Sequence, residues 1–334
     1  MTLLNFRFIF FAALFSLIIS PAAVQLALKL GLVDRPNAEP HKTHVKAAPL
    51  AGGIVIASII LSFAFAAGLF GSKDVRAILA GGVVVLLFGA LDDHKSLSPI
   101  WKMVGQVIAA GVMVLLGVQV LLFRINLLNV GLTLLWVVGV TNAFNFVDSM
   151  DGLASGLAGV AAGFFVLVAY ESGQLQLSSF SAILVGICAG VYYSTAMPAR
   201  YFLGDSGAQL LGFVLGGLAI AYNPSGFLPT QSWYIPVLLV GVPIFDTALV
   251  IISRLRRHKP IYKSGLDHTY HRLVALGMHP NRAVLTMHFM SILLGCLAFI
   301  ALSLPPLWSN VVFMACLTAG LVGLIFLEKW YRPT

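Results

Sequence analysis

Residues 127–152 read LLNVGLTLLWVVGVTNAFNFVDSMDG and join an apolar run directly to a polar one. The apolar part is long enough for a helix to cross the roughly 30 Å hydrocarbon core of a bilayer. At its end, Asn142, Asn145, Asp148 and Asp151 recur at every third position. On a helix this spacing places the four polar side chains along one stripe. The stretch therefore predicts a membrane-spanning helix that carries chemically active groups at one membrane face.

The whole chain has the composition of a membrane protein. Of its 334 residues, 59% are hydrophobic and only 10% are charged, whereas soluble domains carry about 25% charged residues. We predict an all-α, polytopic integral membrane protein, folded as a single transmembrane catalytic domain over residues 1–334, with about eleven transmembrane helices and ten as the alternative. The expected spans are 6–30, 50–71, 75–91, 100–119, 127–147, 153–171, 178–197, 206–222, 233–253, 284–304 and 307–327.

The charged residues predict the orientation of these spans. Most of the 20 lysines and arginines fall in the loops after odd-numbered spans and at the C-terminus, so the positive-inside rule places the N-terminus outside and the C-terminus in the cytoplasm. All of the 12 acidic residues except Asp74 and Glu171 lie on the same side. Acidic residues contribute little to topology, so their clustering predicts a polar site at the cytoplasmic face. The net charge of +8 then reflects membrane anchoring and a phosphate-binding rim, and we expect no nucleic-acid partner.

Two acidic motifs stand at the cytoplasmic ends of predicted spans. Asp92 and Asp93 follow one span directly. Neighbouring residues on a helix point about 100° apart, so one carboxylate can bind a cation while the other binds or orients another group. Asp205, between Gly204 and Ser206, precedes another span. There it can cap a helix, bind a metal ion, or do both.

The ninth span and the basic loop after it supply further polar groups. Asp246 lies late in that span, where a carboxylate needs a cation or a hydrogen-bonded partner, and Arg254 or another loop arginine is the expected one. In the loop, His268, His271 and Arg272 have the i, i+3, i+4 spacing of one helix face. That arrangement suits the binding of a phosphate or diphosphate.

Together these groups predict a phosphoryl-transfer site. Hard oxygen ligands favour Mg²⁺, with Mn²⁺ as the alternative, over zinc. The three cysteines lie inside apolar runs and indicate packing, with neither zinc nor disulfide chemistry. Phosphoryl transfer needs a divalent cation and basic groups around the phosphates, and an apolar bundle implies that one substrate is a lipid. We expect no ATP hydrolysis, because the chain has no Gly-rich loop ending in Lys-Ser/Thr.

The chain resembles the polyprenyl-phosphate N-acetylhexosamine-1-phosphate transferases, a membrane family that initiates bacterial glycan pathways. The resemblance runs from Gly31 to about Val284, and its motifs occur in the family order. They are Gly31-Leu32-Val33-Asp34-Arg35-Pro36-Asn37, His44 through Pro49-Leu50-Ala51-Gly52-Gly53, Asp92-Asp93, the Asn145/Asp148/Asp151 stretch, Phe202-Leu203-Gly204-Asp205-Ser206-Gly207 and the loop containing His268.

The resemblance implies a reaction in which polyprenyl (undecaprenyl) phosphate attacks the β-phosphorus of a UDP-N-acetylhexosamine, releasing UMP. It implies an active site formed by cytoplasmic loops at about 31–49, 92–99, 148–152, 198–205 and 254–283, facing the cytoplasm of a bacterial inner membrane, in an ordinary homodimer. The resemblance also implies a role for each motif residue: Asp92 and Asp93 would bind Mg²⁺ and activate the lipid phosphate, and Asp205 would bind Mg²⁺ directly. On the donor, Asn145, Asp148 and Asp151 would contact the nucleotide side, and His268, His271 and Arg272 the diphosphate or sugar. Lys42, His44 and Lys46 would lie near the phosphates.

Some positions depart from the family pattern. Thr195 stands where the family commonly has Asn, ten residues before the motif aspartate, and the histidine motif is shortened. The first loop has Ala38 through Lys42 where the family usually has Arg-Lys soon after Asn. The segment around Asp246 resembles the N-acetylglucosamine branch more than the muramoyl-pentapeptide branch.

Three alternative functions stay open at this point. The nearest is the use of a peptidyl UDP-sugar, as in the muramoyl-pentapeptide transferases. An intramembrane aspartyl protease would use Asp205 with a second carboxylate and one shared proton. It has no use for Asp92, Asp93, His268 or Arg272. A lipid or anion transporter would need ionisable residues near the bilayer midplane and an internal repeat, and the sequence shows neither.

Overall fold

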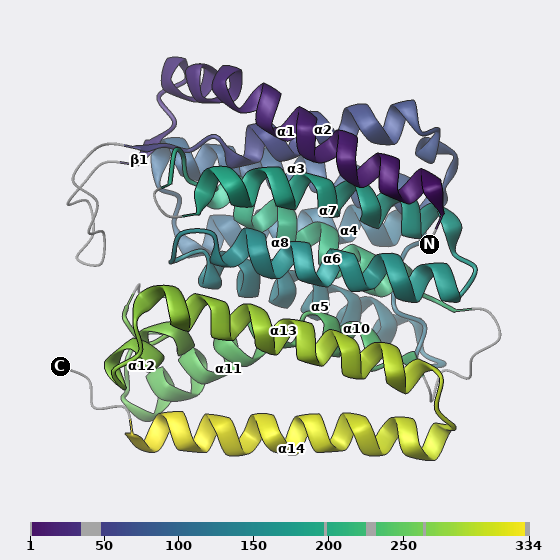
Figure 1. The fold of residues 1–334 in the computed structure, drawn as a ribbon, viewed down its shortest axis with the longest axis vertical. Helices are drawn as coiled ribbons and strands as arrows, with labels where there is room; N and C mark the ends of the chain where they lie inside the picture. The colour runs from purple at the N-terminus through teal and green to yellow at the C-terminus, as the bar shows by residue number, and fades with distance from the viewer. Residues whose placement is uncertain (1, 35–47, 197–198, 225–231, 263–264, 331–334) are drawn as a thin grey trace.

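The structure, a computed structural model, describes residues 2–34, 48–196, 199–224, 232–262 and 265–330, and these fold almost entirely into helices (Figure 1). The elements are α1 (Leu3–Lys29), β1 (Val33–Asp34), β2 (Ala48–Pro49), α2 (Gly52–Ala66), the 3₁₀ helix η1 (Leu69–Gly71), α3 (Lys73–Lys95), α4 (Pro99–Leu115), α5 (Asn126–Val147), α6 (Leu153–Glu171), α7 (Leu175–Thr195), α8 (Gly204–Ala221), α10 (Ile235–Leu239), α11 (Gly241–Arg256), α12 (Thr269–Ala275), α13 (Pro280–Leu302) and α14 (Pro306–Trp330).

The helices confirm an all-α, multi-pass membrane protein. Eight of those described, α1, α3, α5, α6, α7, α8, α13 and α14, are long and apolar enough to cross a membrane, and α2 and α4 are shorter apolar helices. Every predicted span coincides with one of the helices, apart from the ninth, which is divided. The start of α1 and the end of α14 lie at opposite ends of the bundle (Figure 1), as an odd number of crossings requires. The count of eleven and the orientation stay predictions.

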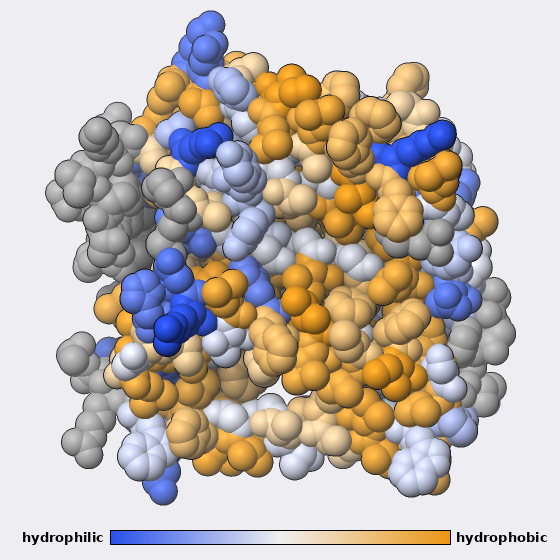
Figure 2. Space-filling view, in the orientation of Figure 1, coloured by the Kyte–Doolittle hydropathy of each residue, from blue (hydrophilic) through white to orange (hydrophobic). Residues whose placement is uncertain are grey.

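The outer surface of the bundle is apolar where lipid would cover it. Figure 2 shows hydrophobic side chains over most of one face, with hydrophilic ones gathered mainly at its two ends. Leu115 is 86% exposed and Phe65 79%, exposures that would be costly in water for side chains of this size. On α14 only Ser309 and Leu327 are buried. This surface is suited to a bilayer.

Helix α8 occupies the centre of the bundle. It packs against α2, α3, α5 and α6, and nearly all of its residues are buried. After Gly204, four further glycines, at 207, 212, 216 and 217, run along it, and small residues let neighbouring helix backbones approach closely. The helix that begins with Gly204 and Asp205 is thus the one most tightly fixed by its neighbours.

The ninth predicted span is broken into α10 and α11 around Val240. Pro243 explains the break, because it has no amide hydrogen and its ring clashes with the carbonyl of residue 239. The apolar pattern predicted the segment as one helix, since hydropathy does not register a change of helix axis.

Two helix ends differ from the sequence prediction. The predicted span 75–91 extends as α3 to Lys95, so Asp92 and Asp93 lie in its last turn rather than in a loop. The predicted polar stripe on one helix was wrong beyond Val147, where α5 ends. Asp148 and Asp151 lie in the following turn, because Ser149 and Asp151 are weak helix formers and Gly152 takes a φ of 74°.

A small sheet ties the first loop to the segment before α8. Strands β1 and β2 pair antiparallel. At the end of β2, the Phe202 amide donates to the Pro49 carbonyl (3.0 Å), and just after β2 the Gly52 amide donates to the Phe202 carbonyl (3.2 Å). Strand β1, helix α12 and the end of α14 all lie at one end of the bundle (Figure 1). The predicted cytoplasmic segments therefore gather at one end.

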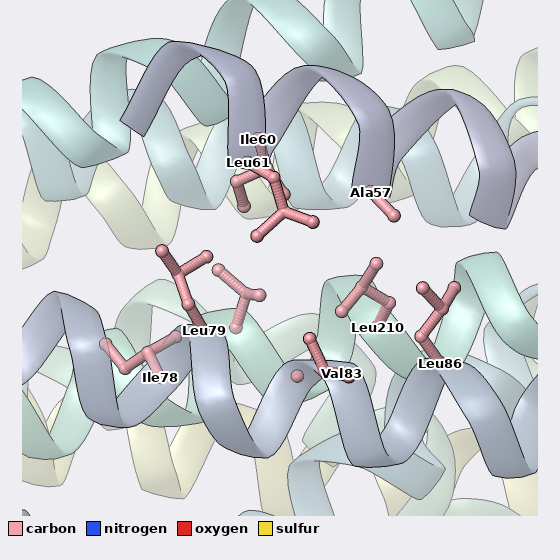
Figure 3. Close-up of a pocket in the computed structure, with 10 residues that line it drawn as sticks. Ala57, Ile60, Leu61, Ile78, Leu79, Val83, Leu86 and Leu210 are labelled. Carbon is pink, nitrogen blue, oxygen red and sulfur yellow. The ribbon is translucent and has the colours of Figure 1, made fainter. Parts of the chain in front are cut away.

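An apolar pocket lies between α2 and α3. Figure 3 shows Ala57, Ile60 and Leu61 of α2 facing Leu79 and other side chains of α3 across it. Its full lining is Ala57, Ile60, Leu61, Ile78, Leu79, Gly82, Val83, Leu86, Leu210 and Val214. Since all of these residues are apolar, the pocket offers no group that could bind phosphate or a metal ion.

The orientation can be tested by cysteine labelling in a variant lacking Cys188, Cys296 and Cys316. Tyr262 (67% exposed) and Leu121 (78% exposed) lie in segments predicted to face opposite sides of the membrane. In intact cells, a membrane-impermeant maleimide is expected to label Leu121→Cys but to label Tyr262→Cys only after lysis. Labelling of Tyr262→Cys in intact cells would contradict the predicted orientation.

Candidate functional site

The carboxylate of Asp93, on α3, binds the beginning of α8. The Asp205 amide donates to its Oδ1 (2.7 Å), while the Ser206 amide (3.2 Å) and the Ser206 hydroxyl (2.5 Å) donate to its Oδ2. The first amides of a helix lack partners within the helix and carry its positive end. Asp205 therefore does not cap its own helix. Asp93 caps it from α3, and this contact leaves the Asp205 carboxylate free to point elsewhere.

Gly204 makes that contact sterically feasible. Its φ of +70° lies in the left-handed region, and a Cβ atom at this position would lie 2.8 Å from Oδ2 of Asp93. A side chain at 204 would therefore displace the carboxylate as well as strain the backbone. The Gly-Asp pair that the sequence singled out is explained by this close approach.

Lys102, on α4, joins two carboxylates at the same place. Its ammonium forms ion pairs with Asp92 and, at 3.2 Å, with Oδ2 of Asp205. The other oxygen of Asp92 accepts the Leu97 amide (2.6 Å), and the Asp92 and Asp205 carboxyl groups are close enough to interact. Helices α3, α4 and α8 thus contribute one group each to a compact charged cluster.

The end of α5 completes this carboxylate cluster. The side chain of Asn145 lies close enough to the Asp205 carboxylate to interact with it. Asp148 is partly buried, and burial together with the negative charges of Asp205, Asp93 and Asp151 raises its pKa well above the ordinary value. A carboxyl group with a raised pKa next to other carboxylates is typical of functional sites.

The donor set suits a hard divalent cation. No three histidine, cysteine or acidic side chains of the described residues converge closely enough to hold a metal ion by themselves. Mg²⁺ does not require such a cage, because it usually binds through one or two carboxylates, waters and the phosphates of the substrate. Asp205 and Asp92, which already share the ammonium of Lys102, are the carboxylates that would hold it.

A second group of polar side chains surrounds Asp246, and here the expected partner was wrong. Asp246 is fully buried; Nδ1 of His268 lies 2.8 Å from its Oδ2, and the Thr269 amide donates to its Oδ1 (2.6 Å). Arg254 instead binds Asp267 (2.9 Å). The sequence places Arg254 two helical turns beyond Asp246, on the same helix, whereas His268 reaches it when the loop folds back.

Asp267 holds the two ends of the basic loop together. It accepts hydrogen bonds from Arg254 (2.9 Å) and Arg257 (2.7 Å). Partial burial works against its charge, but the bonds from Arg257 and Arg254 outweigh this and hold the pKa of Asp267 below its ordinary value. It is therefore ionised at neutral pH and fixes the loop ahead of α12.

Tyr270 connects α12 to the turn after α5. Its hydroxyl donates to the Ser149 carbonyl (3.0 Å) and lies 2.6 Å from Nε2 of His271, while the rings of Phe146 and His268 meet edge to face. The histidines of the basic loop and the Asp148–Asp151 turn are therefore parts of one site.

Arg272 turns away from this site. It is 1% exposed and donates to Oε2 of Glu328 (2.7 Å) and to the carbonyls of Leu327 (3.2 Å) and Asp267 (2.8 Å). Its contacts on α14 hold α12 in place. Although it shares the sequence spacing of His268 and His271, its position favours a supporting role over substrate contact.

The structure brings together most of the residues that the sequence singled out. Asp92, Asp93, Asn145, Asp148 and Asp205 form the carboxylate cluster; Asp151 interacts with Asp148, and His268 and His271 adjoin the same turn. Lys42, His44 and Lys46 lie outside the described residues. Lys102 was missed as a site residue, although a lysine inside an apolar run is a recognised functional signal.

Comparison with known proteins agrees with this site. The sequence model of glycosyl transferase family 4 matches residues 75–223, which include both the Asp92-Asp93 and the Gly204-Asp205 motifs. A Bacillus subtilis protein named "Probable undecaprenyl-phosphate N-acetylglucosaminyl 1-phosphate transferase" is 30% identical to this chain, and the match covers 95% of this chain and 91% of that protein. A decaprenyl-phosphate N-acetylglucosaminephosphotransferase of Mycobacterium tuberculosis is 30% identical, and the match covers 92% of this chain and 86% of that protein. A phospho-N-acetylmuramoyl-pentapeptide-transferase of Halalkalibacterium halodurans is 27% identical, and the match covers 85% of this chain and 93% of that protein.

The chain belongs to the polyprenyl-phosphate N-acetylhexosamine-1-phosphate transferases, within glycosyl transferase family 4. The resemblance noted from the motifs is confirmed over nearly the whole chain.

The capping contact predicts that Asp93 contributes more to stability than Asp205 does. Asp93→Ala removes three hydrogen bonds to a charged acceptor and is expected to lower the free energy of unfolding by about 1–3 kcal/mol. Asp205→Ala removes a carboxylate that has other carboxylates around it, so it is expected to lower the free energy of unfolding by less than Asp93→Ala does, or to raise it. Thermal unfolding in detergent measures both. A Tm for Asp93→Ala equal to or above that of Asp205→Ala would contradict this account of the helix start.

Proposed function

We propose that this protein transfers N-acetylhexosamine 1-phosphate from a UDP-sugar to polyprenyl phosphate. The products are UMP and a polyprenyl-diphospho-sugar that initiates a cell-envelope glycan. The observation that carries the proposal is the cluster of Asp92, Lys102 and Asp205 at one end of an apolar bundle, in a chain whose relatives are named as enzymes of this kind. A lipid and a nucleotide can meet only at such a boundary between bilayer and water.

The reaction joins two anions, and its main barrier is therefore electrostatic. An oxygen of the lipid phosphate forms a bond to the β-phosphorus, and the bond from that phosphorus to the oxygen bridging to the α-phosphate breaks, so that UMP leaves. A divalent cation at Asp205 and Asp92 would neutralise non-bridging phosphate oxygens. Lys102 lies against the same carboxylates and supplies a fixed positive charge for the developing negative charge of the leaving phosphate.

The two motif aspartates divide their roles in this proposal. Both oxygens of Asp93 accept hydrogen bonds from the start of α8, so Asp93 positions Asp205. Asp92 is paired with the ammonium of Lys102 and does not bind the start of α8, so we assign the lipid phosphate to Asp92. Asn145, Asp148 and Asp151 line the nucleotide side, where a carboxyl of raised pKa such as Asp148 can take up a proton.

The histidine side of the site is assigned to the donor. His268 is oriented by Asp246, and His271 by Tyr270. We assign both histidines to the diphosphate or sugar, and we assign Arg272 to the support of α12. Lys42, His44 and Lys46, in the first loop, are proposed to bind phosphate as well.

The donor is proposed to be a UDP-N-acetylhexosamine of the N-acetylglucosamine type. The Bacillus subtilis and Mycobacterium tuberculosis relatives, both named for N-acetylglucosamine, are 30% identical to the chain, whereas the muramoyl-pentapeptide transferase is 27% identical. A peptidyl donor is thus not favoured. Because these relatives are bacterial, we propose the inner membrane as the location, with the site facing the cytoplasm, and a homodimer as the assembly.

The proposal is tested by UMP release from purified protein. Release is expected to require a UDP-N-acetylhexosamine, polyprenyl phosphate and Mg²⁺ or Mn²⁺ together, and to stop in EDTA. Asp205→Asn, which removes the charge but keeps the shape, is expected to lower kcat by about 100-fold or more, the order of loss seen when a charge-stabilising group is removed from an active site.

The matched control is Asp74→Asn. Asp74 lies in the first turn of α3, at the end opposite Asp92 and Asp93, so this variant is expected to retain wild-type kcat. A panel of UDP-sugars in the same assay identifies the donor. Full activity of Asp205→Asn, or of the wild-type protein in EDTA, would contradict the metal assignment. No UMP from any sugar in the panel would contradict the proposed reaction.

A further inference from the structure

A second polar layer lies beneath the carboxylate cluster. Nε2 of Gln106 donates to Oε1 of Gln209 (3.0 Å) and to Oδ1 of Asn142 (3.3 Å), and Nδ2 of Asn142 donates to Oε1 of Gln106 (2.5 Å). Gln106 and Gln209 are each 1% exposed. We call these three residues the amide layer; its members come from α4, α5 and α8.

The amide layer repeats the cluster above it, helix by helix. Gln106 follows Lys102 by four residues on α4, and Gln209 follows Asp205 by four residues on α8. Asn142 precedes Asn145 by three residues on α5, a helix that runs the opposite way. Each amide therefore lies about one helical turn, or roughly 5 Å, deeper than its site residue on the same face.

The amide layer is a poor device for stability alone. Amide groups in an apolar interior must be hydrogen-bonded, and replacing a whole bonded set by apolar groups of the same shape is often neutral. Among the described residues Nε2 of Gln209 has no hydrogen-bond partner, which adds a cost. Apolar side chains at these positions would thus hold the helices together about as well.

What the amide layer provides is the register of the helices, that is, the axial position and rotation of each helix relative to its neighbours. Apolar faces tolerate sliding, whereas amide groups pair at one axial position and one rotation, as a buried Asn does in a coiled coil. A slip of one residue along α4 would move Lys102 by about 1.5 Å and rotate it by about 100°. Its 3.2 Å contact with Asp205 would not survive that shift.

We propose that Gln106, Asn142 and Gln209 are positioning residues for the transferase site. The amide layer fixes α4, α5 and α8 in the register that makes Lys102, Asn145 and Asp205 converge. This inference rests on the proposed function, since it concerns the alignment of the groups assigned to phosphoryl transfer. It extends the site to a layer that touches no substrate.

The test replaces the two glutamines of the amide layer by methionines, which have a similar shape but cannot form the amide hydrogen bonds. The double variant Gln106→Met/Gln209→Met is expected to keep the wild-type Tm and both KM values, while kcat falls about 10- to 100-fold, the loss typical of removing groups that orient active-site ligands. The single variant Gln209→Met keeps the Gln106–Asn142 pair and is expected to lose less. Gln119→Met, in the loop at the opposite end of the bundle, is the matched control and is expected to retain wild-type kcat.

A second readout does not depend on turnover. In a variant without the native cysteines, Lys102→Cys and Asp205→Cys are expected to be crosslinked by a short dimaleimide, and the two methionines are expected to abolish most of this crosslinking. The inference would be overturned if the double methionine variant had wild-type kcat and unchanged crosslinking. It would equally be overturned if the variant had a lowered Tm while kcat and crosslinking stayed at their wild-type values. Absence of UMP release by the wild-type protein would contradict the proposed function, and the crosslinking comparison would still decide the inference.

Discussion

The carboxylate of Asp93, bound to the first amides of α8, is the contact on which the rest of the site depends. A helix start buried in an apolar bundle leaves amide hydrogens that need an acceptor, and a neighbouring helix supplies it here. This arrangement requires glycine at 204. It also turns the carboxylate of Asp205 towards Lys102 instead of its own backbone.

The site that results concentrates negative charge at one end of the apolar bundle. Asp92, Asp93, Asp148 and Asp205 lie near one another, and Lys102 is the cation that two of them contact. In a medium of low dielectric constant such a cluster would attract a divalent ion strongly. The same charge would repel a phosphate that arrived without a cation. In the proposed reaction, Lys102 and a bound divalent cation would offset this charge and let an anionic lipid approach an anionic nucleotide.

The surroundings of the cluster keep it rigid from two directions. Beneath it the amide layer joins α4, α5 and α8. Beside it the basic loop is held by Asp267 and by the pairing of Arg272 with Glu328, and Tyr270 fastens this loop to the turn after α5. Phosphoryl transfer depends mainly on positioning and electrostatics, so this rigidity is itself part of the proposed mechanism.

The sequence predicted those features that depend on local patterns. Apolar run lengths predicted the helices, and the one-sided distribution of acids predicted the site at one end of the bundle. Pairings between distant segments were not predictable, because they depend on how helices pack: His268 with Asp246, Arg272 with Glu328, and Lys102 with two aspartates. Lys102 in particular lay inside an apolar run and was counted only as a topology signal.

The central claim, that the site transfers a sugar with its phosphate, is tested most directly by following one phosphorus atom. The purified protein is given polyprenyl phosphate, Mg²⁺ and a UDP-N-acetylhexosamine radiolabelled at the β-phosphorus, and the lipid and nucleotide products are separated. The account predicts that the label enters the lipid product and that the released nucleotide is unlabelled UMP. Release of labelled UDP, with an unlabelled sugar on the lipid, would show that a glycosidic bond was cleaved instead and would contradict the account.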